Sequence, residues 1–333
     1  MADYLLDYWY LGAWSHEVSE RPLRRTLFDT AVALYRSGAG QVRAVEDRCA
    51  HRFARLSGGR VVGDALECPY HGLRFGPDGK CTHNPFSPVI PQQARVRAFP
   101  VIENDGFIWF WPGEPRLARE TPVPDYRFIK QKPTFELLRL YNKLEADFLL
   151  GIDNLMELSH AGFLHRNSIG QGTDVLMELF RGGTYKGWEE NGAVISRWTF
   201  SERAHEWAQS RWQAPSSVVV SKGFDHNIPP QPGLMYGLHV FTPETRRSCH
   251  YFAVEAFDRA VHTDPDYAQR MAEYIGKTVF HDEDCMLLEG IQQHLDEVSA
   301  LSDSAVLLAI DAGAVMARRQ YRRLLEAQAR ARS

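Results

Sequence analysis

The chain has 333 residues, of which 44% are apolar and 24% are charged, and its formal net charge is −4. This length exceeds one ordinary hydrophobic core and predicts two domains. The weak net charge gives no indication of binding to nucleic acid or to an anionic membrane.

Three further features concern the compartment. No apolar run approaches the roughly 20 residues that span a bilayer. The N-terminal segment "MADYLLDYWYLGAW" lacks the basic flank of a signal peptide. Five cysteines in a chain of this size do not suggest a disulfide framework. We therefore expect a cytoplasmic protein without a membrane anchor.

The first third of the chain predicts an all-β domain. Residues 31–36 and 41–46 flank the turn 37–40 and predict a hairpin. Further strands are predicted in three segments, 60–68, 95–103 and 106–112. The Pro-rich passage 111–126 is the expected linker. We place the two domains at residues 1–118 and 119–333.

The second domain has a different pattern. Residues 142–165 keep apolar side chains at helical spacing, and helices are also predicted at about 264–298 and 303–330. Between them, strands are predicted at 193–200, 216–223, 234–242 and 249–257. This order predicts an α+β domain in which a curved antiparallel sheet wraps on a long helix, a helix-grip or START-like arrangement.

Two loops of the first domain each contain one cysteine and one histidine, as Cys49-x-His51 and Cys68-x-x-His71. Structural zinc sites usually contain a pair of cysteines and a pair of histidines at short spacing, so zinc is the weaker alternative here. Four unrelated residues are the other alternative. A two-iron cluster fits best, because two sulfurs can bind one iron and two ring nitrogens the other.

The text C-x-H-R followed by C-P-Y-H-G-L-x-F resembles the Rieske domain of Rieske non-haem iron oxygenases. The same motif occurs in Rieske ferredoxins, which only carry electrons. Because this chain is much longer than a ferredoxin, we expect a second function and a second metal.

A second metal site is predicted at residues 154–165. His160 and His165 could supply the two imidazoles of a non-haem iron(II) site, which also needs one carboxylate. Two histidines at this spacing also occur by chance. The segment resembles the family signature N-x-x-D-x-x-H-x(4)-H, which begins here at Asn154 and has Glu157 in place of the usual Asp. The resemblance implies that this acid bridges a Rieske histidine of one subunit to an iron-bound histidine of the next.

The third ligand is expected in the helix near residue 280, which offers Asp282, Glu283 and Asp284. Asp284 falls on a predicted apolar stripe formed by Phe280, Leu287, Ile291 and Leu295. A buried carboxylate is costly unless it is paired or binds a metal. The family segment E-D-x-x-x-x-E gives the same answer, so Asp284 is the predicted ligand and a solvated acidic turn is the alternative. His281 and Cys285 are expected to be ordinary helix residues.

Residues 154–160 and 239–252 resemble the branch of vanillate O-demethylase and dicamba monooxygenase oxygenase components. This resemblance places His239 in the substrate pocket, as a hydrogen-bond donor to an aromatic carboxylate; a buried structural histidine is the alternative. Val218 and Ile275 occupy positions where the dicamba enzyme has polar and aromatic residues, so dicamba itself is not the expected substrate. His250 is expected to be structural.

The resemblance implies a terminal oxygenase component with a [2Fe-2S] Rieske cluster, a mononuclear Fe(II) and O2 as co-substrate. Electrons from NADH would pass through a flavin reductase and a ferredoxin to the cluster of a head-to-tail homotrimer. The expected reaction is O-demethylation of a methoxylated aromatic acid with release of formaldehyde. Ring hydroxylation, N-demethylation or oxidation of a non-aromatic compound is the second reading. An electron-transfer or binding subunit without oxygenase activity is the third.

Basic residues are concentrated around the two Cys-His loops. Between residues 48 and 80 they exceed the acidic residues by three, in a chain whose total charge is negative. We expect either a docking patch for an acidic ferredoxin that includes Arg52 and Arg55, or a solvated surface.

Overall fold

The computed structural model of the chain describes residues 4–130, 133–201, 206–223, 236–260, 262–295 and 305–332. The chain divides into two compact units, residues 2–124 and residues 125–333. The boundary at 118/119 given by the sequence lies inside a short helix, α1 (Pro115–Glu120). No helix within the described ranges is both long enough and apolar enough to cross a membrane.

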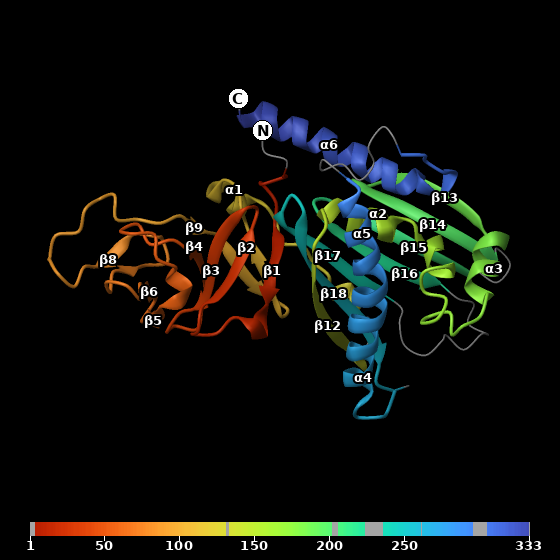
Figure 1. Cartoon of the computed structure of the whole chain (residues 1–333), viewed down its shortest axis with the longest axis horizontal. Coiled ribbons are helices and arrows are strands. Elements are labelled where there is room, and N and C mark those ends of the chain that lie inside the picture. The colour runs from red at the N-terminus through yellow and green to blue at the C-terminus, as the bar shows by residue number, and fades with distance from the viewer. Residues whose placement is uncertain are drawn as a thin grey trace. The chain divides into compact units, whose positions relative to one another are not determined.

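The N-terminal unit consists of short antiparallel strands, as predicted (Figure 1). They form a three-stranded sheet of order β1-β11-β10 and two four-stranded sheets of order β2-β3-β4-β9 and β5-β6-β7-β8. The strands are β1 (Tyr10–Trp14), β2 (Leu23–Leu27), β3 (Thr30–Arg36), β4 (Val42–Glu46), β5 (Arg60–Val62), β6 (Ala65–Glu67), β7 (Arg74–Phe75), β8 (Cys81–His83), β9 (Ala98–Phe99), β10 (Val101–Asn104) and β11 (Phe107–Phe110). Two single 3₁₀ turns, η1 (Ser15–Glu17) and η2 (Leu56–Gly58), connect them.

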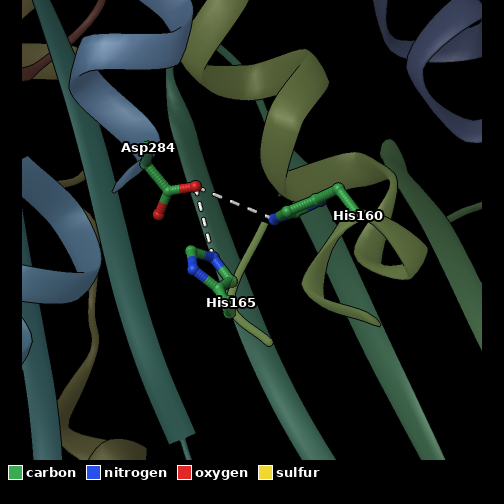
Figure 2. A group of neighbouring side chains, drawn as sticks. All are labelled: His160, His165 and Asp284. Carbon is green, nitrogen blue, oxygen red and sulfur yellow. Dashed lines mark ion pairs between the residues drawn. The ribbon is translucent and has the colours of Figure 1, made fainter. Parts of the chain in front are cut away.

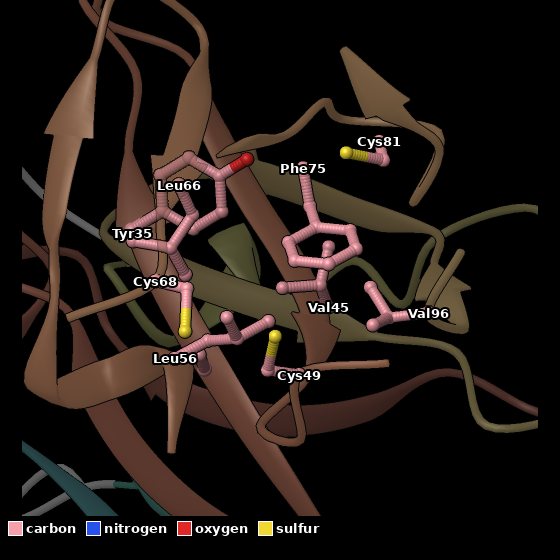
Figure 3. Packing of buried hydrophobic residues seen from close by; sticks show 10 residues of the cluster. Tyr35, Val45, Cys49, Leu56, Leu66, Cys68, Phe75, Cys81 and Val96 are labelled. Atoms are coloured by element: carbon pink, nitrogen blue, oxygen red, sulfur yellow. The ribbon is translucent and has the colours of Figure 1, made fainter. Parts of the chain in front are cut away.

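The predicted hairpin is confirmed, because β3 and β4 pair antiparallel across the turn 37–40. Gly40 adopts φ +77° in this turn, a conformation that favours glycine. The buried side chains of this hairpin, among them Tyr35 and Val45, pack with Leu66 and Phe75 of the neighbouring sheet. This core extends to the thiols of the two Cys-His loops, as Figure 3 shows.

The C-terminal unit is built on a seven-stranded antiparallel sheet of order β12-β18-β17-β16-β15-β14-β13, which confirms the predicted α+β fold. The strands are β12 (Phe135–Leu144), β13 (Thr184–Glu190), β14 (Ala193–Ser201), β15 (Glu206–Gln213), β16 (Ser217–Gly223), β17 (Tyr236–Thr245) and β18 (Ser248–Asp258). The helical segments are η3 (Arg127–Ile129), α2 (Phe148–Met156), η4 (Leu158–Gly162), α3 (Val175–Gly182), α4 (Tyr267–Glu273), η5 (Tyr274–Cys285), α5 (Met286–Gln293), η6 (Ala309–Asp311) and α6 (Ala312–Arg332).

Helix α2 packs directly on the sheet. Gly151 allows this close approach, because a Cβ atom at that position would lie 2.4 Å from the ring of Phe241 on β17. The last carbonyls of a helix lack partners within the helix. Here the hydroxyls of Ser196 and Ser210, on β14 and β15, donate to the carbonyls of Met156 and Leu155. The sheet therefore fixes the end of α2, immediately before the predicted iron ligands.

Segments α4, η5 and α5 follow one another without interruption from Tyr267 to Gln293, and η5 is a π-helix of 12 residues. The apolar stripe predicted from α-helical spacing is wrong in its second half. Leu287 and Ile291 are 43% and 38% exposed, whereas Leu288 and Gln292 are buried. A π turn contains more residues than an α turn, so the buried face shifts by one residue beyond it.

Two other helix predictions need correction. Residues 142–144 belong to strand β12, and the helix predicted to continue through residue 165 ends at Met156. The last helix begins at Ala312 rather than near 303, and Leu307 is exposed ahead of it. Residues 234–235 of a predicted strand and 296–298 of a predicted helix lie outside the described residues.

Candidate functional site

The two Cys-His loops of the N-terminal unit have the same backbone structure. In each loop, the cysteine N–H donates to the carbonyl five residues later, and the N–H four residues later donates back to the cysteine carbonyl. The four bonds join Cys49 to Ala54, Phe53 to Cys49, Cys68 to Leu73 and Gly72 to Cys68 at 2.8–3.0 Å. The fourth residue is left-handed in both loops, with φ +61° at Phe53 and φ +69° at Gly72. Glycine adopts this conformation readily, whereas phenylalanine rarely does.

These loops separate their ligand atoms by type. The side chains of Cys49 and Cys68 lie in the core at 1% and 2% exposure. The imidazoles of His51 and His71 lie toward the surface, with their ring centroids 4.7 Å apart. Burial raises the pKa of Cys49 to about 11, so a bound cation is needed to hold its thiolate. Two inner sulfurs and two outer nitrogens fit a two-iron cluster with one iron of each kind.

A second set of ligands meets in the C-terminal unit. His160 of η4, His165 of the following loop and Asp284 of η5 each offer one ligand atom, and these atoms lie within 4.8 Å of one another (Figure 2). Oδ1 of Asp284 is 3.8 Å from Nε2 of His160 and 3.3 Å from Nε2 of His165. Burial lowers the pKa of His160 and so favours the neutral imidazole that binds metals. Two imidazoles and one carboxylate fit iron(II).

Two residues orient the carboxylate and one of the imidazoles. The Asn154 side-chain amide donates to Oδ1 of Asp284 at 3.0 Å. The Nδ1 atom of His165 lies 2.7 Å from Oε2 of Glu283, which also accepts a hydrogen bond from the Ser168 hydroxyl. Burial opposes a proton on His165, but Asp284 and Glu283 outweigh it and raise the pKa of this imidazole. The sequence analysis weighed Glu283 only as a ligand and missed this second role, although the outer nitrogen of a ligating histidine usually bonds an acid.

Glu157 has a structural role that its predicted bridging role did not include. Its carboxylate accepts hydrogen bonds from the backbone N–H groups of Ser159 and His160, and so caps the N-terminus of η4. The Nδ1 atom of His160 is paired with the backbone carbonyl of Glu157 instead. The predicted bridge to a neighbouring subunit therefore requires this carboxylate to serve two purposes.

His239 lies on the face of the sheet that η5 covers. It is 3% exposed, its Nδ1 atom is 2.8 Å from the hydroxyl of Tyr251, and its ring centroid is 5.5 Å from that of Phe280. Burial lowers the pKa of His239 to about 4, so the imidazole is neutral. Val218, its cross-strand partner, and Ile275 of η5 are also buried.

The remaining candidates lie outside the ligand set. Asp282 is solvent-accessible and forms ion pairs with Lys277 at 2.5 Å and with His281 at 2.8 Å. Cys285 is buried as a free thiol. The Nδ1 atom of His250 lies 2.9 Å from the hydroxyl of Tyr141.

The basic residues near the Cys-His loops divide into two groups. Arg60 and Arg74 both pair with Glu67, and Lys80 pairs with Asp78. Arg52 and Arg55 are exposed, and no described carboxylate lies within 4.0 Å of their guanidinium nitrogens.

A hollow of about 1120 Å³ opens beside Cys49 in the same unit. Its lining includes five arginines: Arg43, Arg48, Arg95, Arg97 and Arg119. The guanidinium carbon of Arg48 lies 3.8 Å from the ring centroid of Phe53, the left-handed residue of the first loop. The surface next to the buried cysteines is therefore rich in arginine.

Comparison with known proteins covers both units. Residues 8–100 match the Rieske [2Fe-2S] domain, and residues 144–327 match the vanillate O-demethylase oxygenase C-terminal domain. The chain is 32% identical to the dicamba O-demethylase oxygenase component of Stenotrophomonas maltophilia, over 96% of this chain and 98% of that protein. It is also 32% identical to the chloroacetanilide N-alkylformylase oxygenase component of Rhizorhabdus wittichii, over 98% and 97%. The crystal structure of dicamba monooxygenase bound to dicamba matches with a TM-score of 0.84 and 31% identity, over 98% of this chain and 99% of that one.

Proposed function

The chain belongs to the Rieske non-haem iron oxygenases with a vanillate O-demethylase type of catalytic domain, and from this premise we propose that it demethylates a methoxylated aromatic compound. It is the oxygenase component of such a monooxygenase system, with a Rieske cluster and a mononuclear non-haem iron as cofactors. The resemblance drawn from its motifs is thereby confirmed. The balanced reaction converts a methoxyarene, O2, NADH and a proton to a phenol, formaldehyde, NAD⁺ and water.

One observation supports this proposal most strongly: His160, His165 and Asp284 come together from segments distant in sequence. When bound there, the iron supplies oxygen activation, with electrons from the cluster. The protein groups hold it in place. Asn154 orients the Asp284 carboxylate, and Glu283 holds the His165 ring with Nε2 toward the metal.

The polar end of the substrate would contact His239. Its Nδ1 atom is occupied by Tyr251, so Nε2 is the nitrogen available to a ligand. The sequence resemblance favours an aromatic carboxylate as the partner. N-dealkylation is the second candidate reaction, because the N-alkylformylase component is as similar to this chain as the dicamba O-demethylase component.

The chain would form a head-to-tail ring of three subunits. Large exposed aromatic side chains lie beside the ligands of both sites. Tyr70 is 58% exposed, and its ring centroid is 3.8 Å from that of His71. Phe163 is 68% exposed, and its N–H donates to the carbonyl of His160. A neighbouring subunit that covers both surfaces would bring one cluster close to the next iron. The mass in solution should then be three times 38.0 kDa.

A substrate panel tests the proposed reaction. The holoenzyme would be supplied with NADH, a surrogate flavin reductase and ferredoxin, and methoxylated benzoates, phenols and anilides. Formaldehyde and phenol in equal amounts would support O-demethylation. Ring-hydroxylated products, or aldehyde release only from N-alkyl compounds, would replace it with the second reaction. Oxygen consumption without any product across the panel would count against both.

A further inference from the structure

A buried acid lies beside His239, and no motif pointed to it. Glu255 on β18 pairs directly with Gly237 on β17, and His239 is two residues further along β17. Because side chains alternate across a strand, all three positions lie on one face of the sheet. That face carries α2 and η5, since Phe241 packs against Gly151 and His239 against Phe280.

The position of Gly237 defines a small recess between these two side chains. A Cβ atom there would lie 2.8 Å from Oε1 of Glu255 and 2.8 Å from Nε2 of His239. The two side-chain atoms themselves are 3.7 Å apart. This separation is too long for a direct hydrogen bond. It is short enough for one oxygen atom to reach both groups.

The carboxyl group of Glu255 has no strong partner of its own. The residue is 7% exposed, and none of the described residues donates a hydrogen bond to it. A buried polar group without a hydrogen bond is costly. Its neighbour His239 is neutral, and its hydrogen bond to Tyr251 leaves Nε2 free to face the recess. The recess thus offers a ligand two unused hydrogen-bonding groups.

We propose that the recess formed by Gly237, His239 and Glu255 binds a neutral hydroxyl group of the substrate, so that the enzyme prefers a methoxyphenol to a methoxybenzoate. A hydroxyl oxygen can accept a hydrogen bond from Nε2–H of His239 while its proton is donated to Glu255. A carboxylate lacks this proton. This proposal rests on the proposed demethylase function and specifies its substrate class.

A carboxylate could bind here only if Glu255 carried a proton. Burial raises the pKa of Glu255 to about 8, and the opposite charge of Lys222 on β16 only partly offsets that rise. The other described groups that face this region are His239, Tyr251 and the Asp284 carboxylate of η5. Below pH 8 the protonated acid tolerates a second carboxyl group. Above pH 8 a bound carboxylate requires proton uptake, so the preference for a hydroxyl increases with pH.

Anaerobic calorimetry of the iron-loaded protein tests this without turnover. The ligands are 3-methoxyphenol and 3-methoxybenzoate, between pH 7 and pH 9. Wild-type affinity for the benzoate should fall about tenfold per pH unit above pH 8, while that for the phenol stays constant. Glu255→Gln removes the titration but keeps a donor and an acceptor. Its affinity for the benzoate should be independent of pH, and that for the phenol should change less than about threefold.

Two controls isolate Glu255. Glu244→Gln makes the same chemical change on β17, where the carboxylate pairs with Lys143 at 3.1 Å, and should leave both affinities unchanged. Lys222→Gln should preserve the pH dependence of benzoate binding. Loss of benzoate binding in Lys222→Gln would show that the lysine anchors a carboxylate, and would overturn the proposal.

The outcomes also separate this proposal from the proposed function. Wild-type benzoate affinity that stays flat from pH 7 to pH 9 would overturn the role of Glu255, even if formaldehyde is produced. Phenol binding with the expected pH profile but no formaldehyde would support the recess and overturn the demethylase function.

Discussion

Two consecutive carboxylates of η5 contact opposite nitrogens of one imidazole. Glu283 lies 2.7 Å from Nδ1 of His165, and Asp284 lies 3.3 Å from Nε2 of the same ring. The bond to Glu283 keeps a proton on Nδ1 and leaves the Nε2 lone pair for a metal. One turn of helix thus supplies a ligand and also orients another ligand.

Glu283→Gln should weaken iron binding without affecting the Rieske cluster. The amide cannot hold the Nδ1 proton as strongly as a carboxylate, and loss of such a partner typically costs 10- to 100-fold in metal affinity or activity. The measurement is mononuclear iron per chain after titration with a chelator. Asp282→Asn is the matched control, because Asp282 pairs with Lys277 and His281 and not with a ligand. Equal iron loss in both variants would contradict the assigned role.

Asp284→Asn should lose the mononuclear iron and all product formation while the Rieske absorption spectrum stays unchanged. Asparagine keeps the shape of the side chain but removes the charge that offsets iron(II). Iron analysis and visible spectroscopy on the same sample separate the two centres. Retention of full activity would exclude Asp284 as a ligand.

Glu157→Gln tests both roles of this acid. A weaker cap on η4 should lower stability by about 0.5–2 kcal/mol. If the carboxylate also carries electron transfer between subunits, the variant should bind both metals, accept electrons at the cluster and form almost no product. Glu157→Asp keeps a capping carboxylate and should retain partial activity. Thermal unfolding and single-turnover product yield, measured together, distinguish a cap from a bridge, and normal yield in Glu157→Gln would exclude the bridge.

Gly237→Ala should fill the recess beside His239. The new methyl group would lie 2.8 Å from Oε1 of Glu255 and from Nε2 of His239, so both hydrogen bonds to a substrate hydroxyl would be lost. At about 1 kcal/mol each, this corresponds to about 10- to 30-fold weaker binding of 3-methoxyphenol. Gly290→Ala in α5 is the control, because no atom lies within 4 Å of its added Cβ. Calorimetry on both variants provides the comparison.

Arg52→Glu should slow reduction of the cluster by an acidic ferredoxin several-fold at low salt, with a smaller effect at high salt. Charge steering of this kind is screened over about 10 Å at 0.1 M salt. Arg60→Glu is a useful comparison, since Arg60 is already paired with Glu67 and should contribute less to steering. Stopped-flow reduction rates that do not change with salt in the wild type would leave Arg52 as a solubility residue.

The sequence predicted the ligand set more reliably than the helix that carries Asp284. Residue type and motif spacing were enough to select His160, His165 and Asp284, which the structure brings together. The stripe used to support Asp284 assumed α-helical periodicity, and the π-helix displaced the face beyond it from Leu287 to Leu288. Helix type depends on tertiary contacts that a single sequence does not reveal.

Other site features depend on distant partners and had no local signal. Glu255 belongs to the site only because β17 and β18 pair in one register, which places it opposite Gly237. A shift of one residue would turn it to the other face. Glu157 was read as a bridge because its motif position suggested one, whereas its use as a cap follows from the backbone turn after Met156. Such roles require the pairing and turn geometry as well as the residue type.

The π-helix also links the mononuclear iron to the pitch of its own helix. Removal of one residue from η5 would turn Asp284 by about 100° relative to the preceding face and away from the two histidines. Iron should therefore favour the π form over a competing α form of this segment, as any ligand favours the state it binds. In the iron-free protein, we expect faster amide hydrogen exchange between residues 274 and 285 than in β17 or β18. Helix pitch would then serve as a reporter of metal occupancy.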